Sequence, residues 1–162
     1  MGIINDYFRA ADADHAMLAI ASSPRNIGFD TVEAGGIDPW VMLSQLLAFI
    51  RGTPSSPDTV TTRTVWPPPK TEPSSKDDYD QLPESSPWRT GPWLHELNVE
   101  IRDALALVDD VRLPELADRW ARIEEFRGTE SGDGLLPLLK ELVELARRAH
   151  KNGEPLYCLS GL

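Results

Sequence analysis

The sequence is poor in cysteine, in histidine and in long apolar runs. Cys158 is the only cysteine among the 162 residues, which excludes an internal disulfide, and the three histidines are far apart in the chain. Neither a CxxC nor an HExxH pattern occurs, so we expect no metal ion and no cofactor. Polar residues interrupt every apolar run well before the roughly 20 residues that a transmembrane helix needs.

The sequence also lacks an excess of basic residues. Its 16 Lys and Arg stand against 26 Asp and Glu, which gives a formal net charge of -10. Nucleic acids and anionic membranes attract clustered positive charge, so we expect neither as a partner, whereas a basic protein partner suits this balance. The N-terminal residues show no basic segment followed by an apolar one, and together with the single cysteine this favours a cytoplasmic location.

No signature of a common catalytic or phosphate-binding site is present. The chain contains no GxSxG turn, no GxxxxGK[ST] loop and no GxGxxG after a strand. Cys158 lies in the apolar run of residues 156–159, where a buried thiol usually behaves as an inert small apolar group. These absences favour a non-enzymatic protein and leave enzymatic activity open.

Amphipathic helices and short apolar strands are what the sequence does contain. Residues 133–152 carry apolar side chains at three- and four-residue steps, and Gly153 provides a C-terminal stop. The Asp38-Pro39 pair is typical of a helix start, and we place the following Trp40, like Trp120 of a later helix, in the core. Further helices are predicted over residues 15–21, 99–108 and 113–123, and strands over residues 2–8, 27–33, 60–66, 91–97 and 156–159.

These elements predict an α+β fold for residues 1–162 as a single domain. About five helices would pack on a small, mainly antiparallel sheet, because strands and helices follow one another without regular βαβ alternation. A chain of this length buries roughly two-thirds of the surface that its unfolded form exposes, so the fold needs neither a disulfide nor a metal ion.

Residues 53–92 differ in composition from the rest of the chain. They hold nine of the 14 prolines and many Ser, Thr and Asp, so we expect a long Pro-rich loop or insertion that is mobile between residues 71 and 87. Tryptophans border this segment and acidic residues lie beside them, a combination that suits a binding surface for a basic partner. In the alternative interpretation the tryptophans only fasten the loop to the domain. The predicted binding residues are Trp66, Asp77, Asp78, Asp80, Trp88 and Trp93.

Two functions fit these features. The first is a non-enzymatic protein-interaction domain, such as an immunity-type protein or an inhibitor that covers a basic toxin or enzyme. The second is a small-molecule-binding or enzymatic domain with a pocket under the segment from Trp66 to Trp93, in which His95 or Glu96 acts as an acid–base group. The second function requires that at least one of these two side chains face away from bulk solvent. A third interpretation is a structural domain that self-associates through an edge strand.

Several motifs follow one another in a fixed order along the chain. Residues 1–4 open it with Met-Gly-Ile-Ile, residues 38–53 form an aromatic helix that ends in Gly-Thr, and residues 105–120 contain Asp-Asp and Leu-Pro-Glu-Leu. An amphipathic helix, a Gly turn and an apolar strand close the sequence. This order resembles the YfbM-like family of small bacterial proteins over most of the chain apart from residues 54–86. Small actinobacterial proteins are similar in the Trp-Pro-Pro-Pro of residues 66–69. The resemblance implies an α+β domain and supplies neither a catalytic site nor a function.

Overall fold

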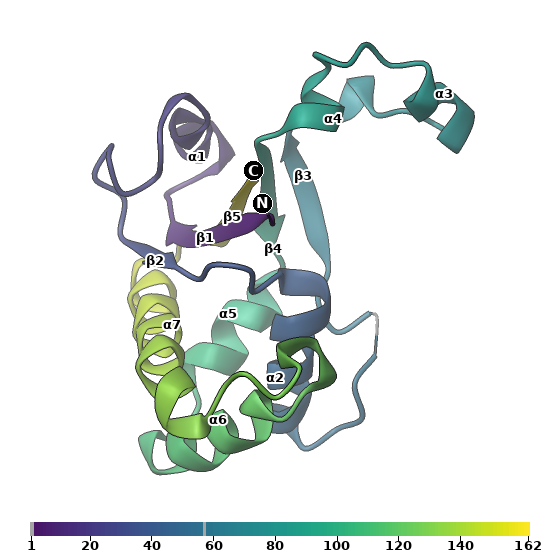
Figure 1. Cartoon of the computed structure of the whole chain (residues 1–162). Helices are drawn as coiled ribbons and strands as arrows, with labels where there is room; N and C mark the ends of the chain where they lie inside the picture. The colour runs from purple at the N-terminus through teal and green to yellow at the C-terminus, as the bar shows by residue number, and fades with distance from the viewer. Residues whose placement is uncertain (1, 57) are drawn as a thin grey trace.

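The computed structural model describes residues 2–56 and 58–162, so that Met1 of the opening motif and Pro57 of the Pro-rich segment lie outside the described residues. Within this part of the chain, the strands form one fully antiparallel sheet in the order β2-β1-β5-β4-β3 (Figure 1). This confirms the α+β class and the antiparallel sheet. The strands are β1 (Ile4–Arg9), β2 (Thr31–Glu33), β3 (Thr62–Trp66), β4 (Trp93–Leu97) and β5 (Leu156–Gly161).

The last strand of the chain, β5, is the middle strand of the sheet. It pairs with β1 on one side and with β4 on the other, and Ile4 lies opposite Gly161. Residues 156–160 are all buried, because both faces of the sheet are covered at this strand. The first strand therefore begins, and the last strand ends, at the same end of the sheet.

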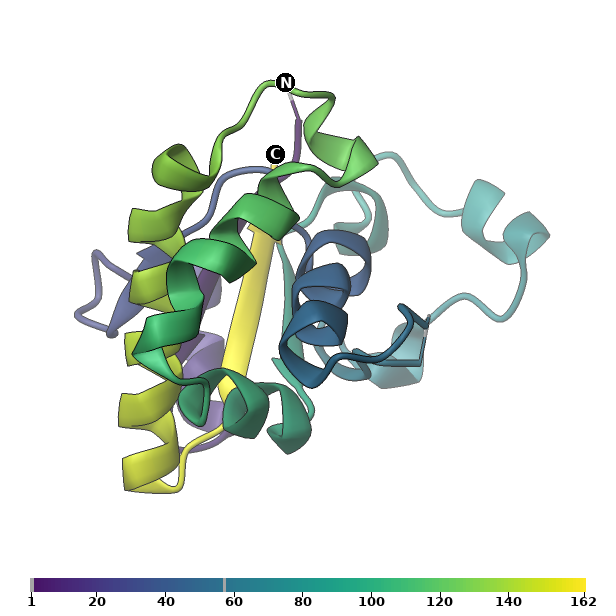
Figure 2. The ribbon, with the colours of Figure 1, turned by 90° about the horizontal axis from the view of Figure 1, so that it is seen from below.

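A layer of helices covers one face of the sheet (Figure 2). Trp120 lies at the centre of the core that this layer forms, is fully buried as predicted, and donates from Nε1 to the carbonyl of Met42 at 2.9 Å. The long helix α7 contributes an apolar stripe from Leu135 to Ala149, which agrees with its three- and four-residue periodicity. The layer consists of α2 (Ser44–Arg51), α5 (Val99–Ala106), α6 (Leu113–Ala121) and α7 (Gly132–Asn152).

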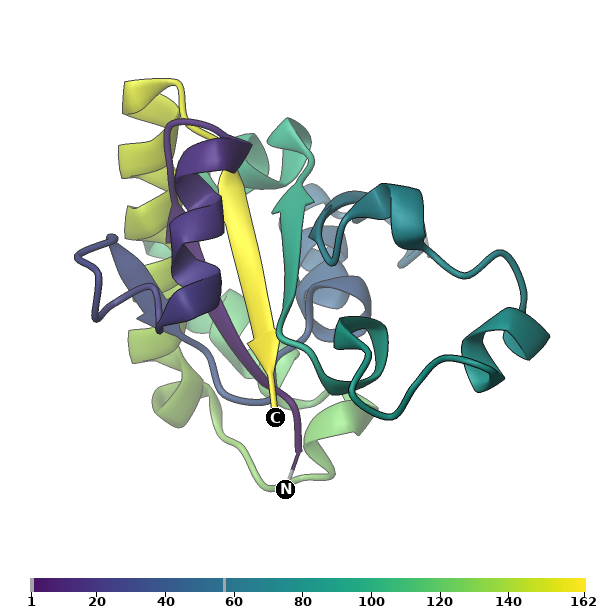
Figure 3. The same ribbon diagram turned by 90° about the horizontal axis from the view of Figure 1, so that it is seen from above.

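A smaller cluster covers the opposite face. The helix α1 (Ala13–Ala16) and the 3-10 turn η1 (Met17–Ala21) lie over β1 and β5 there (Figure 3). Phe8 and Tyr157 point to this face and stack with their ring centroids 5.7 Å apart. Because successive side chains of a strand alternate between faces, Tyr7 and Cys158 point to the helix layer instead.

Residues 68–92, which we name the arm, leave the sheet between β3 and β4 and project to one side (Figures 1 and 3). No residue of the arm is fully buried. The prediction of one long loop is wrong in part, since Ser and Pro residues start short helices here. These are the 3-10 turn η3 (Pro69–Thr71), α3 (Lys76–Asp80) and α4 (Pro87–Thr90).

Two further predictions differ from the structure. Seven α-helical segments occur in the part of the chain that the structure describes, where about five were expected, and two of the seven lie in the arm. The strand predicted over residues 27–33 is only Thr31–Glu33, because Phe29 donates its backbone N–H to Pro24 and closes a turn. Gly28 has a φ of 89° in this turn, a conformation that favours glycine over a strand residue.

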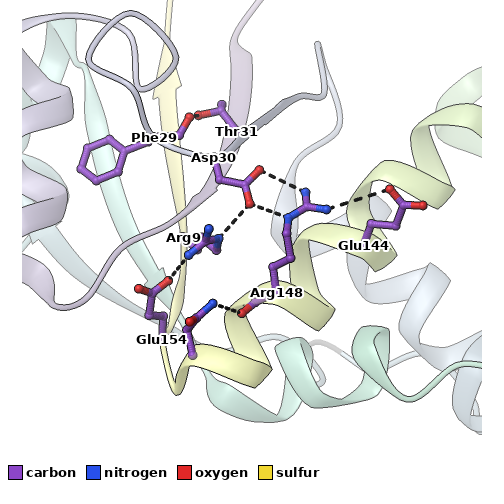
Figure 4. A network of polar contacts seen from close by, with 8 residues as sticks. Arg9, Phe29, Asp30, Thr31, Glu144, Arg148 and Glu154 are labelled. Carbon is purple, nitrogen blue, oxygen red and sulfur yellow. Dashed lines mark hydrogen bonds and ion pairs between the residues drawn. The ribbon is translucent and has the colours of Figure 1, made fainter.

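A network of ion pairs fastens this turn to β1 and α7 (Figure 4). Asp30 accepts hydrogen bonds from Arg9 Nε at 2.8 Å and from Arg148 Nε at 2.6 Å. Arg9 also donates to Glu154 at 2.8 Å. Burial alone would raise the pKa of Asp30, but the hydrogen bonds from Arg148 and Arg9 outweigh it and lower that pKa. We name Arg9, Asp30, Arg148 and Glu154 the Asp30 network.

Candidate functional site

An apolar pocket of about 570 Å³ lies at the end of the sheet where β1 and β4 begin and β5 ends. We name it the His95 pocket. Its lining includes two indole rings, one imidazole and one carboxylate, which come from β4 and from the segment that follows β2, while β1 and β5 contribute Asn5 and Ser160. The side chains that matter below are Asn5, Asp38, Trp40, Trp93, His95 and Ser160.

Antiparallel pairing brings three of these side chains together. Trp93 lies opposite Ser160, and Asn5 lies opposite Ser160 on the other side of β5. His95 follows two residues after Trp93 and so points to the same face as Leu97, which belongs to the core under the helix layer. The pocket therefore opens on the helix side of the sheet.

The fourth wall comes from Asp38 and Trp40. Asp38 Oδ1 accepts from the backbone N–H groups of Trp40 at 2.9 Å and Val41 at 2.8 Å, which starts the helical segment as the sequence predicted. The first turn, η2 (Pro39–Leu43), is of the wide π type, in which the N–H of Leu43 reaches the carbonyl of Asp38 at 3.0 Å. Such turns are frequent at functional sites.

This wide turn explains why the prediction of a core position for Trp40 is wrong. The ring is 41% exposed and lies at the pocket instead. A π-type turn holds more residues than an α-helical turn, so the three-residue spacing no longer puts Trp40 and Leu43 on one face. The indole meets the ring of His95 edge to face, with the centroids 5.0 Å apart.

His95 is half-buried, and its burial lowers the pKa of the imidazole, so the ring is neutral at pH 7. Its Nδ1 atom is buried and has no hydrogen-bond partner among the described residues. Nε2 is not among the buried atoms without a partner and makes no hydrogen bond to another described residue, so solvent in the pocket reaches it. His95 thus keeps one accessible polar atom between two tryptophans.

Two buried polar side chains satisfy each other below the pocket. Asn5 and Ser160 are 2% and 4% exposed, and Ser160 Oγ donates to Asn5 Oδ1 at 2.7 Å. Cys158 Sγ lies 3.7 Å from the same Oδ1 atom. Complete burial raises the pKa of the Cys158 thiol to about 12, which keeps it protonated and unreactive at neutral pH.

Glu96 points to the opposite face of the sheet from His95. It forms an ion pair with Arg63 and accepts from the Tyr157 hydroxyl at 3.4 Å. The two side chains proposed as acid–base groups therefore do not meet. His95 faces the pocket and not bulk solvent, which is the condition that the small-molecule hypothesis required.

The tryptophans predicted for binding do not gather at one place. Trp93 lines the pocket, whereas Trp66 packs against the cluster on the opposite face of the sheet. Trp88 donates from Nε1 to Thr71 at 2.9 Å and accepts, through its backbone carbonyl, from Trp93 Nε1 at 3.2 Å. These contacts hold the base of the arm on the sheet.

The acidic residues Asp77, Asp78 and Asp80 lie together on α3, exposed and away from the pocket (Figures 1 and 3). Ser75 caps this short helix by accepting from the N–H of Asp78 at 3.1 Å. Arg89 of α4 donates to the carbonyl of Asp80 at 2.7 Å and so connects the two short helices of the arm.

The sequence analysis missed Asn5, Asp38, Trp40 and Ser160 as pocket residues. Asp38-Pro39-Trp40 was recognised only as a helix start, and no local signal distinguishes a tryptophan at a π-type turn from one in the core. Asn5 is a polar residue within the predicted strand of residues 2–8, which is the one local signal that could have pointed to this site. A buried Asn needs a partner, and Ser160 provides it from 155 positions away.

Comparison with family models, with curated proteins and with solved structures gives no match for this chain. The resemblance to the YfbM-like family therefore stays a prediction. None of the described helices has the length and apolar character required to cross a membrane. Among the described residues, no three His, Cys, Asp or Glu side chains gather in a way that would hold a metal ion.

Proposed function

We propose that this protein binds a small apolar organic molecule in the His95 pocket. The observation that carries the proposal is a cavity of about 570 Å³ whose lining combines two tryptophans with a small number of polar side chains, His95 among them. Pockets for small molecules commonly measure roughly 300–1,000 Å³ and combine apolar walls with a few polar groups. The His95 pocket has both properties.

The hydrogen bonds of the two indole N–H groups support the apolar character of the pocket walls. Trp40 Nε1 donates to Thr62 at 3.3 Å and Trp93 Nε1 donates to the carbonyl of Trp88. Since both N–H groups are used inside the protein, the rings offer only their carbon surfaces to a ligand. An apolar ligand that covers this surface gains the free energy of removing it from water.

The neutral fluorescent probe N-phenylnaphthylamine tests the proposal by titration. We expect saturable binding of one probe per chain, and Trp40→Ala should weaken it about tenfold because one aromatic wall is lost. Trp88→Ala is the matched control, since it removes an indole outside the pocket and keeps the backbone carbonyl that holds Trp93. Absence of saturable binding, or an equal loss in both variants, would contradict the proposal.

A second candidate is a cytoplasmic protein-interaction domain, of immunity or inhibitor type, that covers a basic partner. The observation that favours it is the projecting arm, in which Asp77, Asp78 and Asp80 are exposed and carry their charge away from the body of the protein. Complementary charge accelerates association and makes it sensitive to salt.

Reversal of Asp77, Asp78 and Asp80 to Lys tests this candidate. A stoichiometric basic partner that is captured from native lysate at low salt should be lost at high salt and should associate at least tenfold more slowly with the triple variant. The control reverses three exposed acidic residues outside the arm and changes the net charge equally. An unchanged rate for the arm variant at low salt counts against the interaction function. The control positions are Glu124, Glu130 and Glu141.

A further inference from the structure

We propose that the ligand of the His95 pocket is a neutral molecule with a flat ring and a carbonyl-type acceptor, and that this acceptor takes a hydrogen bond from His95 Nε2. The inference rests on the proposed small-molecule function and specifies the chemistry of its ligand. Four features of the pocket carry it: the tautomer of His95, the internal use of the other polar side chains, the charge of the lining and the flat aromatic walls.

The first feature is the tautomer of the imidazole. A neutral ring carries its proton either on Nδ1 or on Nε2. A proton on Nδ1 would create a buried N–H without an acceptor, because Nδ1 has no partner and no solvent contact. Buried N–H groups without partners are rarer in proteins than under-used acceptors. The proton therefore belongs on Nε2, the nitrogen that the pocket exposes, and His95 offers a donor to a ligand.

The second feature is that the neighbouring polar side chains are already used. Ser160 donates to Asn5, and both are almost completely buried below the pocket, so neither competes for the ligand. The N–H groups of Trp40 and Trp93 bond to protein acceptors. Among the described side chains of the lining, His95 Nε2–H is the donor that remains for a ligand. A ligand acceptor placed against it replaces water, and an apolar group there would leave the donor unsatisfied.

The third feature is charge. Asp38 contributes a carboxylate to the wall, the described residues of the lining include no Lys or Arg, and the whole chain has a net charge of -10. A carboxylate ligand would meet repulsion without a compensating cation. Asp38 would attract a cationic ligand, but an ammonium group has no acceptor for the His95 N–H and would leave that donor unsatisfied. A neutral acceptor, such as a ketone, avoids the repulsion and uses the donor.

The fourth feature is the shape of the walls. The indoles of Trp40 and Trp93 have only their carbon surfaces free, and the Trp40 ring stands at 89° to the His95 ring. Aromatic rings pack well in offset-stacked or edge-to-face arrangements. When the flat ring of a ligand stacks on the Trp40 indole, a substituent that lies in the plane of the ligand ring points towards the imidazole of His95.

Four naphthalene probes test this chemistry by displacement of bound N-phenylnaphthylamine. Methyl naphthyl ketone carries the acceptor, and isopropenylnaphthalene has nearly the same shape with a CH₂ group in place of the oxygen. Naphthoate adds a negative charge and trimethylnaphthylammonium adds a positive one. We expect the ketone to bind more tightly than either charged probe.

Two variants of His95 separate the hydrogen bond from general apolar affinity. In His95→Phe, the affinity for the ketone should fall about fivefold relative to the affinity for isopropenylnaphthalene. His95→Gln places an amide N–H near the position of Nε2 and should restore most of the preference. In the wild type, ketone binding should shift the nitrogen NMR signal of His95 Nε2, a readout that needs no variant.

The failures are distinguishable. If N-phenylnaphthylamine binds but the ketone-to-isopropenyl ratio is the same in wild type and His95→Phe, the inference is wrong and the pocket is a purely apolar site. If either charged probe binds more tightly than the ketone, the inference is also wrong. If N-phenylnaphthylamine itself does not bind the wild type, the proposed function fails and the inference with it.

Discussion

His95 shows how the surroundings of one residue set its chemistry. Trp40 and the neighbouring strands remove part of the imidazole from water, which lowers its pKa, while the pocket keeps Nε2 accessible. An exposed histidine would change charge near neutral pH. In this place the lowered pKa favours the neutral ring, which acts as a hydrogen-bond donor at neutral pH.

The lowered pKa of His95 also predicts a pH dependence of stability. The unfolded chain takes up a proton at His95 as the pH falls below about 6.5, whereas the folded chain resists it down to its lower pKa. The contribution of His95 to the free energy of unfolding is therefore complete above pH 6.5 and is lost as the pH falls through the pKa of the folded state. Urea unfolding on either side of pH 6.5 should show a smaller decrease in stability on acidification for His95→Gln than for the wild type. Equal decreases would contradict the prediction.

At the scale of elements, the Asp30 network joins the turn before β2 to β1 and to the C-terminal half of α7. Arg9, Asp30 and Glu154 are partly buried, Arg148 covers Asp30 from the solvent side, and Asp30 is bonded by two arginines at once. Partly buried ion pairs of this kind contribute more than exposed ones, because solvent and salt screen them less. The network connects elements that are more than 100 residues apart in the chain.

Asp30→Asn tests the contribution of this network. We expect the free energy of unfolding to fall by about 1–2 kcal/mol at neutral pH, since the three charge-assisted hydrogen bonds from Arg9 and Arg148 are weakened. The lowered pKa of Asp30 means that its contribution is complete above the unfolded pKa of about 3.8 and disappears as the pH falls through the folded value. Urea unfolding at neutral and acidic pH measures both effects.

Glu33→Gln is the matched control for this prediction. The pair of Arg25 and Glu33 is more than half exposed on both sides, so its loss should change stability by no more than about 0.5 kcal/mol. If the two variants lose the same stability at neutral pH, the Asp30 network has no special role.

At the scale of the whole molecule, both faces of the sheet are covered and the arm projects from it. Helices cover one face, a smaller cluster covers the other, and the arm projects beside β3 and β4 (Figures 1 and 3). The pocket and the acidic residues of the arm lie in different places. The two candidate functions therefore use separate surfaces, and the variants of Trp40 and of Asp77, Asp78 and Asp80 test them independently.

Local patterns alone predicted much of the fold. The helices α5, α6 and α7 and the strand β5 lie close to their predicted ranges, because apolar periodicity, caps and glycine stops are properties of neighbouring residues. The same kind of signal failed at residues 27–33, where alternation alone suggested a strand and the glycine turn decided otherwise. In the arm, the abundance of proline concealed short helices that Ser75 and Ser86 cap.

The sequence by itself determined the α+β class, the amphipathic helices and the buried character of Trp120. Only the tertiary structure decided where the pocket lies. Asn5 and Ser160 are separated by almost the whole chain, and the pairing of β1, β5 and β4 places them beside Trp93 and His95. Strand order and register depend on contacts between distant residues, and no local periodicity encodes them.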